Sequence, residues 1–450
     1  MTYEEAMSFI KEAEKLGSIP GLKTITDLLD RLGNPQDRLK VVHVAGTNGK
    51  GSTIAFLSGI LAAAGYRTGI YISPSVFSYR EKFQIIHGIA DSSAESEAIL
   101  YKEFISEKDL CKALDEIKSV CEEMVRDGQA HPTSFEIETA MIFSYMDWEQ
   151  VDFLILETGM GGRLDATNVI SSPVCSVITH ISYDHMHFLG NTLEQIANEK
   201  AGIMKRNSCA VTCNQEPEVL KVLGSRAGEL GISMTIADGA KAADIRYSQE
   251  CTTFSYSSDG GMERYQISQL GNYQVENAVL ALETARRMDM LGYPVPGEAI
   301  KKGLMLARWK GRFEHIAKAP DIYVDGAHNM DGAVRLQESI EIYFTNRRLV
   351  FIIGILADKD YKGILHILAP LADTIITLTP DNHRALPSDK LAKEARAYCG
   401  RVFDEGDIEN ALERAYEEAG LEDVIIAFGS LSFLGSMANL VSLRKEKENG

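Results

Sequence analysis

The chain has 450 residues, a formal net charge of -18, and 45% hydrophobic and 24% charged residues. This composition is that of an ordinary globular protein, and the length predicts two domains because it exceeds what one hydrophobic core comfortably supports. The acidic charge disfavours partners such as nucleic acid and anionic membranes, and no apolar run approaches the roughly 18 residues of a membrane span.

The first residues and the cysteines bear on the cellular compartment. The first five residues lack the basic and apolar regions of a signal peptide. The seven cysteines are scattered, and the closest pair, Cys209 and Cys213, has no further cysteine or histidine nearby. Since this spacing is not that of a zinc site, we expect free thiols in the reducing cytoplasm.

Short apolar runs rich in β-branched residues recur along the chain, and each is followed by a helical pattern. This alternation indicates a parallel, doubly wound α/β sheet. Runs that are apolar throughout are expected where helices cover both faces of the sheet. The expected strands are residues 41–45, 68–72, 151–157, 174–181, 210–212, 322–325, 349–355, 374–378 and 424–428.

Two segments interrupt this alternation. Residues 82–132 are polar and helical with little strand character, and they are predicted to form an insertion near a site. Residues 236–270 contain short alternating stretches that suggest a small antiparallel patch, and a helix over 277–290 closes the first domain. We place the boundary near residue 310, with Arg312 at or beside the hinge. The expected domains are an N-terminal P-loop-type doubly wound parallel sheet with the small antiparallel patch, residues 1–309, and a C-terminal Rossmann-like α/β domain, residues 310–450.

The loop between the first strand and the following helix predicts nucleotide binding. It reads Gly-Thr-Asn-Gly-Lys-Gly-Ser over residues 46–52. Glycines let backbone N–H groups point inward at a helix N-terminus, Lys50 supplies a charge for terminal phosphates, and Ser52 or Thr53 can supply an oxygen for Mg²⁺. The standard pattern would need glycine at Val44 and a hydroxyl at Gly51. This departure argues against an ordinary P-loop GTPase or kinase.

Three later residues extend the predicted site. Glu157 ends a buried strand, where ligands of open α/β sheets bind, so it is placed to meet Mg²⁺ on ATP phosphates. The glycines that follow it lack the third glycine of a dinucleotide fingerprint. His185 follows another strand beside Asp184 and is a candidate metal ligand. Lys200 lies further along the chain. From the local sequence alone it is a solvated lysine on a helix. If it instead faces the two candidate metal ligands, its positive charge must be altered.

The second half carries its own polar cluster. Asp325, His328 and Asn329 follow a strand, and they suit contacts to a nucleotide ribose or phosphate and the ordering of a reacting group, although an Asx-turn would explain the Asp and the Asn. Residues 356–360 end the next strand and could equally be a surface turn. Because the phosphate loop lies in one domain and this cluster in the other, we expect a cleft that closes on ATP around Arg312.

Together these motifs resemble a known family. In chain order they are residues 46–52, Ser73-Pro74, Glu157, residues 161–168, Asp184-His185, residues 199–202, Asn277-Ala278, Gly311-Arg312 and residues 325–329. Their order is similar to that of folylpolyglutamate synthase/dihydrofolate synthase, a branch of the Mur-ligase superfamily of ATP-dependent amide ligases. In that family ATP phosphorylates a carboxylate of a pterin-bearing substrate, and L-glutamate then attacks the acyl phosphate to form an amide.

The resemblance implies a role for each matched residue. ATP phosphates would bind Thr47, Asn48, Gly49, Lys50, Gly51 and Ser52; other parts of ATP would contact Asn277, Arg312 and Asp325; and Mg²⁺ would be held by Ser52, Ser73, Glu157 and His185. The folate or dihydropteroate would meet Thr133, Phe135, Arg163 and Asp165, and Ser430 would help bind glutamate. Lys200 matches a lysine that is carbamylated in the family, and His328 matches a residue near the glutamate or acyl phosphate. Lys50, Lys200 and His328 are the catalytic candidates, and a monomer is expected.

Two other functions are compatible with parts of this sequence. A cell-wall ligase acting on a UDP-muramyl peptide would share the ATP chemistry, but the phosphate loop comes too early to follow a separate UDP-binding domain. A regulatory nucleotide-binding protein would be favoured by loss of Glu157, His185 or Lys200, and all three are present. The segment after Ser73-Pro74, including Lys82 and Gln84, is expected to be a mobile loop over the site. The sequence leaves open whether dihydropteroate, folates or both are substrates.

Overall fold

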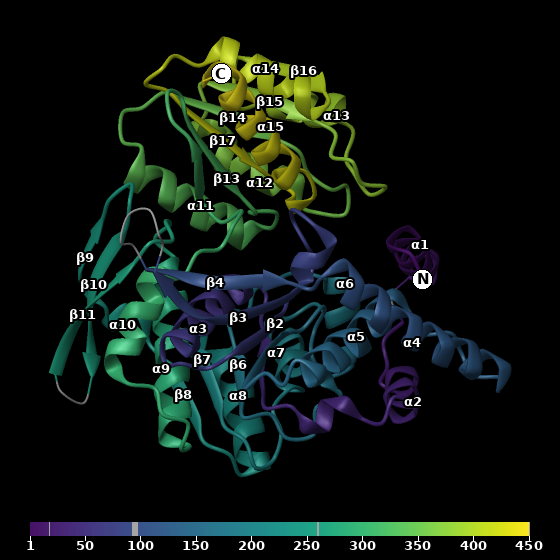
Figure 1. Ribbon diagram of the computed structural model, residues 1–450. Helices are drawn as coiled ribbons and strands as arrows, with labels where there is room; N and C mark the ends of the chain where they lie inside the picture. Colours follow the sequence, from purple (N-terminus) through teal and green to yellow (C-terminus); the bar gives the residue numbers. More distant parts are fainter. Residues whose placement is uncertain (18, 92–97, 259–260, 450) are drawn as a thin grey trace.

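The computed structural model describes residues 1–17, 19–91, 98–258 and 261–449. They form two lobes, one above the other (Figure 1). The lower lobe contains an eight-stranded sheet of order β4-β3-β2-β5-β1-β6-β7-β8 and a three-stranded sheet, and the upper lobe contains a six-stranded sheet. This confirms the expected α/β class.

In the parallel part of the lower sheet, all strands but the last correspond to predicted ones, and residues 234–237 are not predicted as a parallel strand. Its members are β1 (Val41–Ala45), β2 (Thr68–Tyr71), β5 (Phe153–Glu157), β6 (Cys175–Ile178), β7 (Ala210–Cys213) and β8 (Met234–Ala237). Helices cover both faces, because successive strand residues point to opposite sides. On one face Val42, Val44 and Ile155 pack against α3 (Lys50–Ala63), α9 (Gln274–Met290) and α10 (Gly297–Leu306).

The opposite face of the lower sheet is covered by the N-terminal helices and two later ones. Here Val41, Leu154 and Leu156 belong to a core with side chains of these helices. The helices are α1 (Tyr3–Glu14), α2 (Lys23–Arg31), α4 (Glu107–Arg126) and α5 (Ser134–Trp148). Beside β6 and β7, a further cluster packs α7 (Leu193–Ala201) and α8 (Pro217–Leu230).

Two sequence predictions about this lobe are wrong. Residues 82–132 are not a mainly helical insertion, because β3 (Phe83–Asp91) and β4 (Ala98–Phe104) form an antiparallel pair that extends the sheet beyond β2. β4 is an edge strand with mostly exposed side chains, and its apolar run, residues 98–101, is followed by Lys102 and Glu103, so it is shorter than the run of a covered strand. Gln84 lies buried in β3, and Lys82 pairs with Glu138 at 2.7 Å, so neither belongs to a loop over the site.

The predicted antiparallel patch is present. It is the three-stranded sheet β11-β10-β9, formed by β9 (Ala243–Tyr247), β10 (Thr252–Ser258) and β11 (Gly261–Ile267). The helix α9 follows this sheet as expected and begins three residues earlier than predicted.

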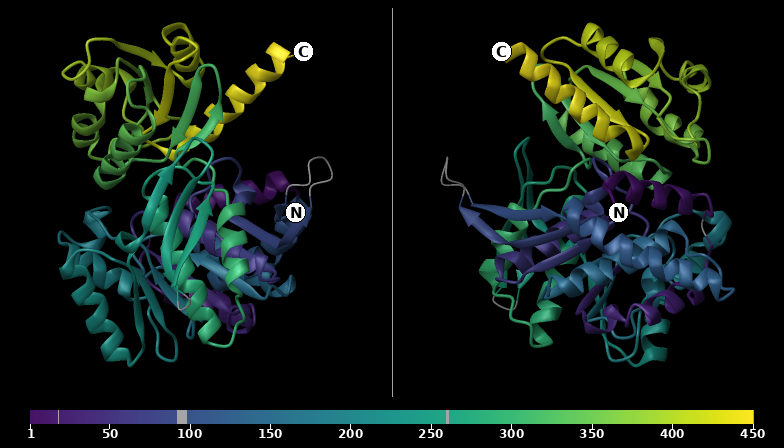
Figure 2. Two further views of the ribbon diagram at one scale, coloured as in Figure 1. Left: turned by 90° about the vertical axis from the view of Figure 1, so that its left-hand side faces the viewer. Right: turned by 45° about the vertical axis from the view of Figure 1, so that its right-hand side comes forward.

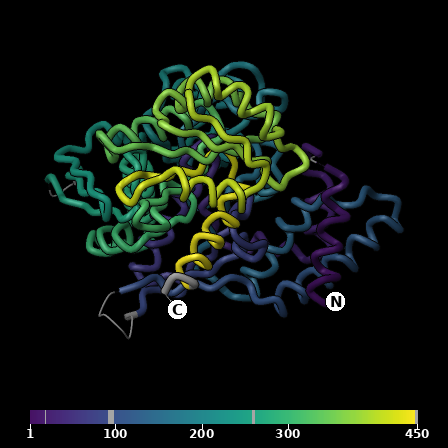
Figure 3. Tube along the Cα trace, turned by 90° about the horizontal axis from the view of Figure 1, so that it is seen from above, coloured from purple at the N-terminus to yellow at the C-terminus, as the bar shows by residue number. Residues whose placement is uncertain are grey.

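The upper sheet has the order β12-β13-β17-β14-β15-β16, and β12 alone is antiparallel to its neighbour. Its strands are β12 (Glu314–Ala317), β13 (Asp321–Asp325), β14 (Leu349–Ile353), β15 (Thr374–Leu378), β16 (Val402–Gly406) and β17 (Val424–Phe428). One face packs α11 (Met330–Tyr343), α12 (Tyr361–Leu368) and α13 (Ser388–Ala395). The other face packs α14 (Ile408–Glu418) and α15 (Leu431–Asn449). In Figures 2 and 3, α15 runs outward from the upper lobe and carries the C-terminus.

Neither disulfides nor membrane-spanning helices are found among the described residues. All seven cysteines are free thiols. Among the residues that the structure describes, every helix is too short or too polar to cross a membrane.

Candidate active site between the lobes

A cavity of about 200 Å³ lies where the two lobes meet, and most of the predicted site residues line it. From the lower lobe these are Thr47, Asn48, Gly49, Lys50, Gly51, Ser52, Ser73, Glu157, His185, Lys200 and Asn277. From the linker and the upper lobe they are Arg312, Asp325 and His328. The predicted substrate residues Thr133, Phe135, Arg163, Asp165 and Ser430 are not part of this lining.

The phosphate loop joins β1 to α3 and is shaped by its glycines. Gly49 has φ +91°, a conformation that side chains disfavour, and a Cβ there would lie 2.4 Å from Asn277 Oδ1. A Cβ on Gly46 would lie 1.7 Å from Thr179 Oγ1. The Lys50 Nζ donates to the carbonyls of Gly46 and Thr47 at 3.2 and 3.3 Å. The loop therefore curls around its own lysine.

Glu157 ends β5 directly beside that lysine. Its Oε1 lies 3.7 Å from Lys50 Nζ, and its Oε2 accepts a 3.3 Å hydrogen bond from the backbone N–H of Ser73. Burial raises the pKa of the Glu157 carboxyl, and the Lys50 charge and the Ser73 N–H oppose that rise. A cation bound here would favour the ionised carboxylate further.

The donor set fits a magnesium ion held against ATP phosphates. Ser52, Ser73 and Glu157 line the same cavity as the phosphate loop, and hydroxyl and carboxylate oxygens are ligands that Mg²⁺ accepts. Within the described ranges, no three His, Cys, Asp or Glu side chains converge into a metal cage. In nucleotide sites Mg²⁺ usually keeps phosphate oxygens and water among its ligands.

Lys200 lies inside the protein instead of on a solvated helix face. Only 4% of the residue is exposed, and its Nζ donates to the carbonyl of Gly46 at 2.8 Å. Desolvation, with a further contribution from the Lys50 charge, lowers the pKa of Lys200 to about 7. A substantial fraction of this side chain is therefore a neutral amine near neutral pH, and a neutral amine is a nucleophile.

Asp184 and His185 lie at the rim of the cavity, where α6 (Met186–Leu189) begins. Desolvation of the His185 ring lowers its pKa against the opposing charge of Asp184. The Asp184 Oδ1 accepts a 2.8 Å hydrogen bond from Lys359 of the upper lobe. Burial opposes ionisation of Asp184, but His185, Lys359 and His328 outweigh it and hold the pKa of this carboxyl well below its usual range.

A second set of contacts between the lobes surrounds Asn48. Its Nδ2 donates to Asp331 Oδ2 at 2.6 Å and to Asn329 Oδ1 at 3.2 Å. Asp331 also lies 3.4 Å from His180. Asp331 and His180 are not among the predicted site residues, and the sequence predicts Lys359 only as part of a strand end or a surface turn. Residues 357 and 358 do form an exposed turn, and Lys359 follows it in a bend. Its side chain is only 11% exposed because it reaches Asp184. No local pattern marks any of the three.

Asp325 fixes the junction between the linker and the upper sheet. Its Oδ2 accepts from Tyr273 Oη at 3.0 Å and from the Phe313 N–H at 2.7 Å, and its Oδ1 accepts from the Ala327 N–H at 2.8 Å. Burial raises the pKa of Asp325, and the nearby Arg312 opposes this. The Arg312 guanidinium packs against Gly326, where a Cβ would lie 1.7 Å from its Nη1.

His328 is neutral and presents one free ring nitrogen. Its Nδ1 lies 2.7 Å from the carbonyl of Gly326, and because a carbonyl only accepts, Nδ1 carries the proton. Burial, with a contribution from the charge of Lys359, lowers the pKa of His328 to about 4. The Nε2 is therefore a lone-pair acceptor, and it lies 3.8 Å from Asp184 Oδ2.

The predicted pterin residues lie beyond the loop that follows Glu157. The Phe135 ring packs on Gly159, where a Cβ would lie 2.5 Å from Cζ. Asp165 Oδ2 accepts from the Met160 N–H at 2.7 Å. Gly159 and Met160 themselves line the cavity. Phe135 and Asp165 therefore support a wall of the cavity from behind.

The remaining predicted substrate residues are engaged with neighbours. Thr133 caps α5 in a reciprocal hydrogen-bonded pair with Glu136. Arg163 pairs with Glu199 at 2.9 Å. Ser430 is buried at the start of α15, 2.9 Å from the Ser432 hydroxyl, next to Leu431 of the cavity lining.

Comparison with known protein families finds a match for each of the two lobes. Residues 44–285 match the Mur ligase middle domain, and residues 311–431 match the Mur ligase glutamate ligase domain. The chain is 33% identical over 445 residues to a Bacillus subtilis protein named dihydrofolate synthase/folylpolyglutamate synthase, covering 97% of this chain and 98% of that one.

Solved structures give the same result at the level of the fold. Mycobacterium tuberculosis folylpolyglutamate synthase complexed with ADP superposes with a TM-score of 0.86 at 28% identity, covering 98% of this chain and 99% of that one. An FPGS–AMPPCP–folate complex superposes with a TM-score of 0.81 at 29% identity, covering 98% of this chain and 100% of the other. The chain belongs to the folylpolyglutamate synthase/dihydrofolate synthase family of Mur ligases.

Proposed function

We propose that this protein is an ATP-dependent ligase that joins L-glutamate to the carboxylate of a folate or dihydropteroate through an acyl phosphate. The observation that carries the proposal is the grouping of Lys50, Glu157 and Lys200 with His328 of the other lobe around one cavity. The name of the Bacillus subtilis relative, which includes both synthase activities, and the nucleotide and folate in the FPGS complex support it.

The chemistry has two displacements. The substrate carboxylate attacks the terminal phosphorus of ATP, and ADP leaves. The amine of L-glutamate then attacks the acyl carbon, phosphate leaves, and the amine loses a proton. The loop N–H groups and Lys50 would stabilise charge on the transferred phosphoryl group. His328 Nε2 has a free lone pair on the upper lobe, which suits it to accept the amine proton.

The metal and the modified lysine complete the proposed site. Ser52, Ser73, Glu157 and His185 would hold Mg²⁺. When bound, the ion supplies charge neutralisation and orientation for the phosphates. Lys200, as a neutral amine, would be carbamylated by CO₂; this replaces a cation with an anion close to the Mg²⁺ site and removes the like charge that Lys50 now faces.

The remaining candidate residues would bind or position ATP, the pterin substrate and glutamate. Asn277, Arg312 and Asp325 would position ATP at the junction of the lobes; the Asp325 oxygens already bond the linker and Tyr273, so its part is to fix that junction. Phe135 and Asp165 would form the pterin side of the site with Thr133 and Arg163, and Ser430 would act at the glutamate side. We further propose domains of residues 1–309 and 310–450 and a cytoplasmic monomer.

The decisive experiment measures ADP release with dihydropteroate and with tetrahydrofolate, each with and without L-glutamate and Mg²⁺. We expect release that requires all components, with one or both pterin substrates accepted. Release that is driven by a UDP-muramyl peptide and not by either pterin would establish the cell-wall ligase instead. That alternative is not favoured, since the relatives described above carry folate-ligase names.

A further inference from the structure

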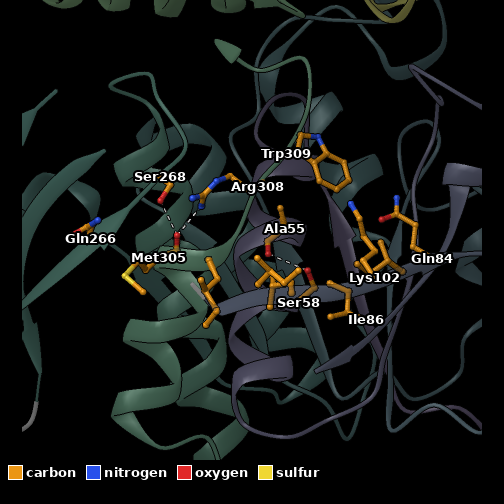
Figure 4. A pocket seen from close by; sticks show the side chains of 15 residues that line it. Ala55, Ser58, Gln84, Ile86, Lys102, Gln266, Ser268, Met305, Arg308 and Trp309 are labelled. Carbon is orange, nitrogen blue, oxygen red and sulfur yellow. Dashed lines mark hydrogen bonds between the residues drawn. The ribbon is translucent and has the colours of Figure 1, made fainter. Parts of the chain in front are cut away.

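The lower lobe contains a second cavity that shares no lining residue with the active-site cavity. It measures about 550 Å³ and lies between α3, the β3–β4 pair, the end of β11 and the end of α10 (Figure 4). A volume of this size falls within the range of small-molecule sites, roughly 300–1,000 Å³.

The cavity has an apolar floor and one aromatic wall. Ile70, Ile86 and Leu100 line it from the strands, Leu306 lines it from α10, and the indole of Trp309 borders it from the linker. Trp309 is half-buried. Flat rings pack well on such a surface.

Polar side chains of Gln84, Lys102 and Arg308 line the cavity beside its apolar surface. Gln84 is 3% exposed; its Nε2 donates to the Glu81 carbonyl, and its Oε1 has no hydrogen-bond partner. The ends of Gln84 and Lys102 lie together on one side of Trp309 in Figure 4, and Arg308 lies on the other. A buried acceptor without a partner carries a free-energy cost that a donor from a ligand would remove.

Trp309 also contacts the phosphate loop. A Cβ on Gly51 would lie 2.6 Å from the Trp309 Nε1 and 2.8 Å from its Cε2, so the indole lies directly against this glycine. The same ring therefore forms a wall of the second cavity and a support of the nucleotide loop. A molecule that stacks on Trp309 acts on a side chain that the loop also contacts.

We propose that this cavity is a second ligand site, which binds a planar aromatic acid with its ring against Trp309, its acidic group near Lys102 and a donor group on Gln84 Oε1. The site is separate from the ligase site, because the two cavities share no lining residue. Its ligand and the nucleotide are coupled through Trp309 and Gly51, and each therefore alters the affinity of the other by the same factor.

The test uses anilinonaphthalene sulfonate, a fluorescent aromatic acid, as the probe. The chain has two tryptophans, so Trp148→Phe leaves Trp309 as the reporter. With the protein saturated with ADP to block the active-site cavity, we expect the probe to bind and to quench Trp309 emission. Complete displacement of the probe by ADP would place it in the nucleotide cavity and overturn the proposal.

Variants locate the probe. Lys102→Gln should weaken binding by about fivefold, the upper end for one exposed charge. Ser58→Leu should abolish it by filling the cavity, since Ser58 is 1% exposed and lines it. Lys118→Gln, an exposed lysine on α4, is the matched control and should have no effect. Equal weakening by Lys118→Gln and Lys102→Gln, or full binding to Lys102→Gln, would contradict the assignment even if Ser58→Leu proved unstable.

Competition identifies the natural ligand class. Displacement by folic acid but not by naphthoate would assign the site to a pterin-bearing acid, and displacement by naphthoate would assign it to aromatic acids more broadly. Displacement by neither would overturn the proposed ligand class. Because the readout is binding, a failure here is distinct from a failure of glutamate ligation.

Discussion

Lys200 sits in α7 with its Nζ on the Gly46 carbonyl, away from solvent. The local sequence describes an ordinary helix lysine, and only tertiary packing lowers its pKa to about 7. The motif resemblance predicts a modified lysine here, and burial supplies a physical reason for such reactivity. The sequence could single out this residue as a candidate, whereas it could not show its buried environment.

Carbamylation of Lys200 should depend on pH. Because the pKa is lowered from 10.5 to about 7, the amine is mostly protonated below pH 7 and mostly neutral above it. We expect a carbon-13 carbamate signal under labelled CO₂ to rise between about pH 6 and about pH 8. Lys200→Arg is the control and should show no such signal; a signal of equal strength in that variant would exclude Lys200 as the acceptor.

Loss of the carbamate should be chemically repairable. Lys200→Ala should lower kcat sharply, and short carboxylic acids such as acetate should restore part of it by occupying the space beside Gly46. Chloride at the same ionic strength is the control. Undiminished turnover in Lys200→Ala would refute a catalytic part for this residue.

Removal of the phosphate-loop lysine should act on the transition state. Lys50→Ala should lower kcat/KM by an amount equivalent to about 3 kcal/mol of transition-state stabilisation, which is the usual scale for one lost preorganised charge contact. It also leaves Glu157 without its nearest cation, which raises the pKa of that carboxyl further. Steady-state kinetics of Lys50→Ala check this, with Lys23→Ala, a change at an exposed lysine on α2, as the control. A near-normal kcat in Lys50→Ala would show that Lys50 takes no part in the chemistry.

At the scale of elements, the strands covered by helices on both faces could be predicted from the sequence, and the edge strands could not. Residues 41–45 and 424–428 are apolar on both faces and form β1 and β17 with those bounds. β4 is exposed along most of its length, and its short apolar stretch is followed by Lys102 and Glu103, so it does not show the continuous apolar run of a covered strand. The pairing of β3 with β2 depends on tertiary contact, which no local pattern records.

The contact between α3 and the linker makes Gly51 sensitive to size. Gly51→Ala adds a methyl group that meets the Trp309 ring, and overpacking of this kind costs roughly 1–3 kcal/mol. We expect weaker AMPPCP binding in calorimetry, with recovery in the double variant Gly51→Ala, Trp309→Leu. Additive losses in the double-mutant cycle would show that the two positions do not interact.

At the scale of the whole molecule, the lobes are joined by polar contacts at the cavity rim. Lys359 reaches Asp184, and Asn48 reaches Asp331 and Asn329. Sequence patterns predicted two lobes and a cleft between them. The partners across the cleft could not be predicted, because they depend on how the lobes are oriented.

The Lys359–Asp184 contact should hold the closed arrangement. Lys359→Ala should enlarge the radius of gyration in X-ray scattering and weaken AMPPCP binding by about 1 kcal/mol, or fivefold. Because the pKa of Asp184 lies well below its usual range, the contact persists through mildly acidic pH and is lost only in stronger acid. Lys362→Ala, which removes a pair with Glu394 inside the upper lobe, is the control; equal expansion of both variants would rule out a specific part for Lys359.

The linker residues on either side of Lys310 contact different lobes. Trp309 lies on the lower lobe against Gly51, while the Gly311 N–H bonds Glu314 and the Gly311 carbonyl accepts from Gly326, both of the upper lobe. Arg312 lies on the upper-lobe side of this point, and His328 lies in the upper lobe itself. Any change in the angle between the lobes would therefore move both side chains together relative to the phosphate loop.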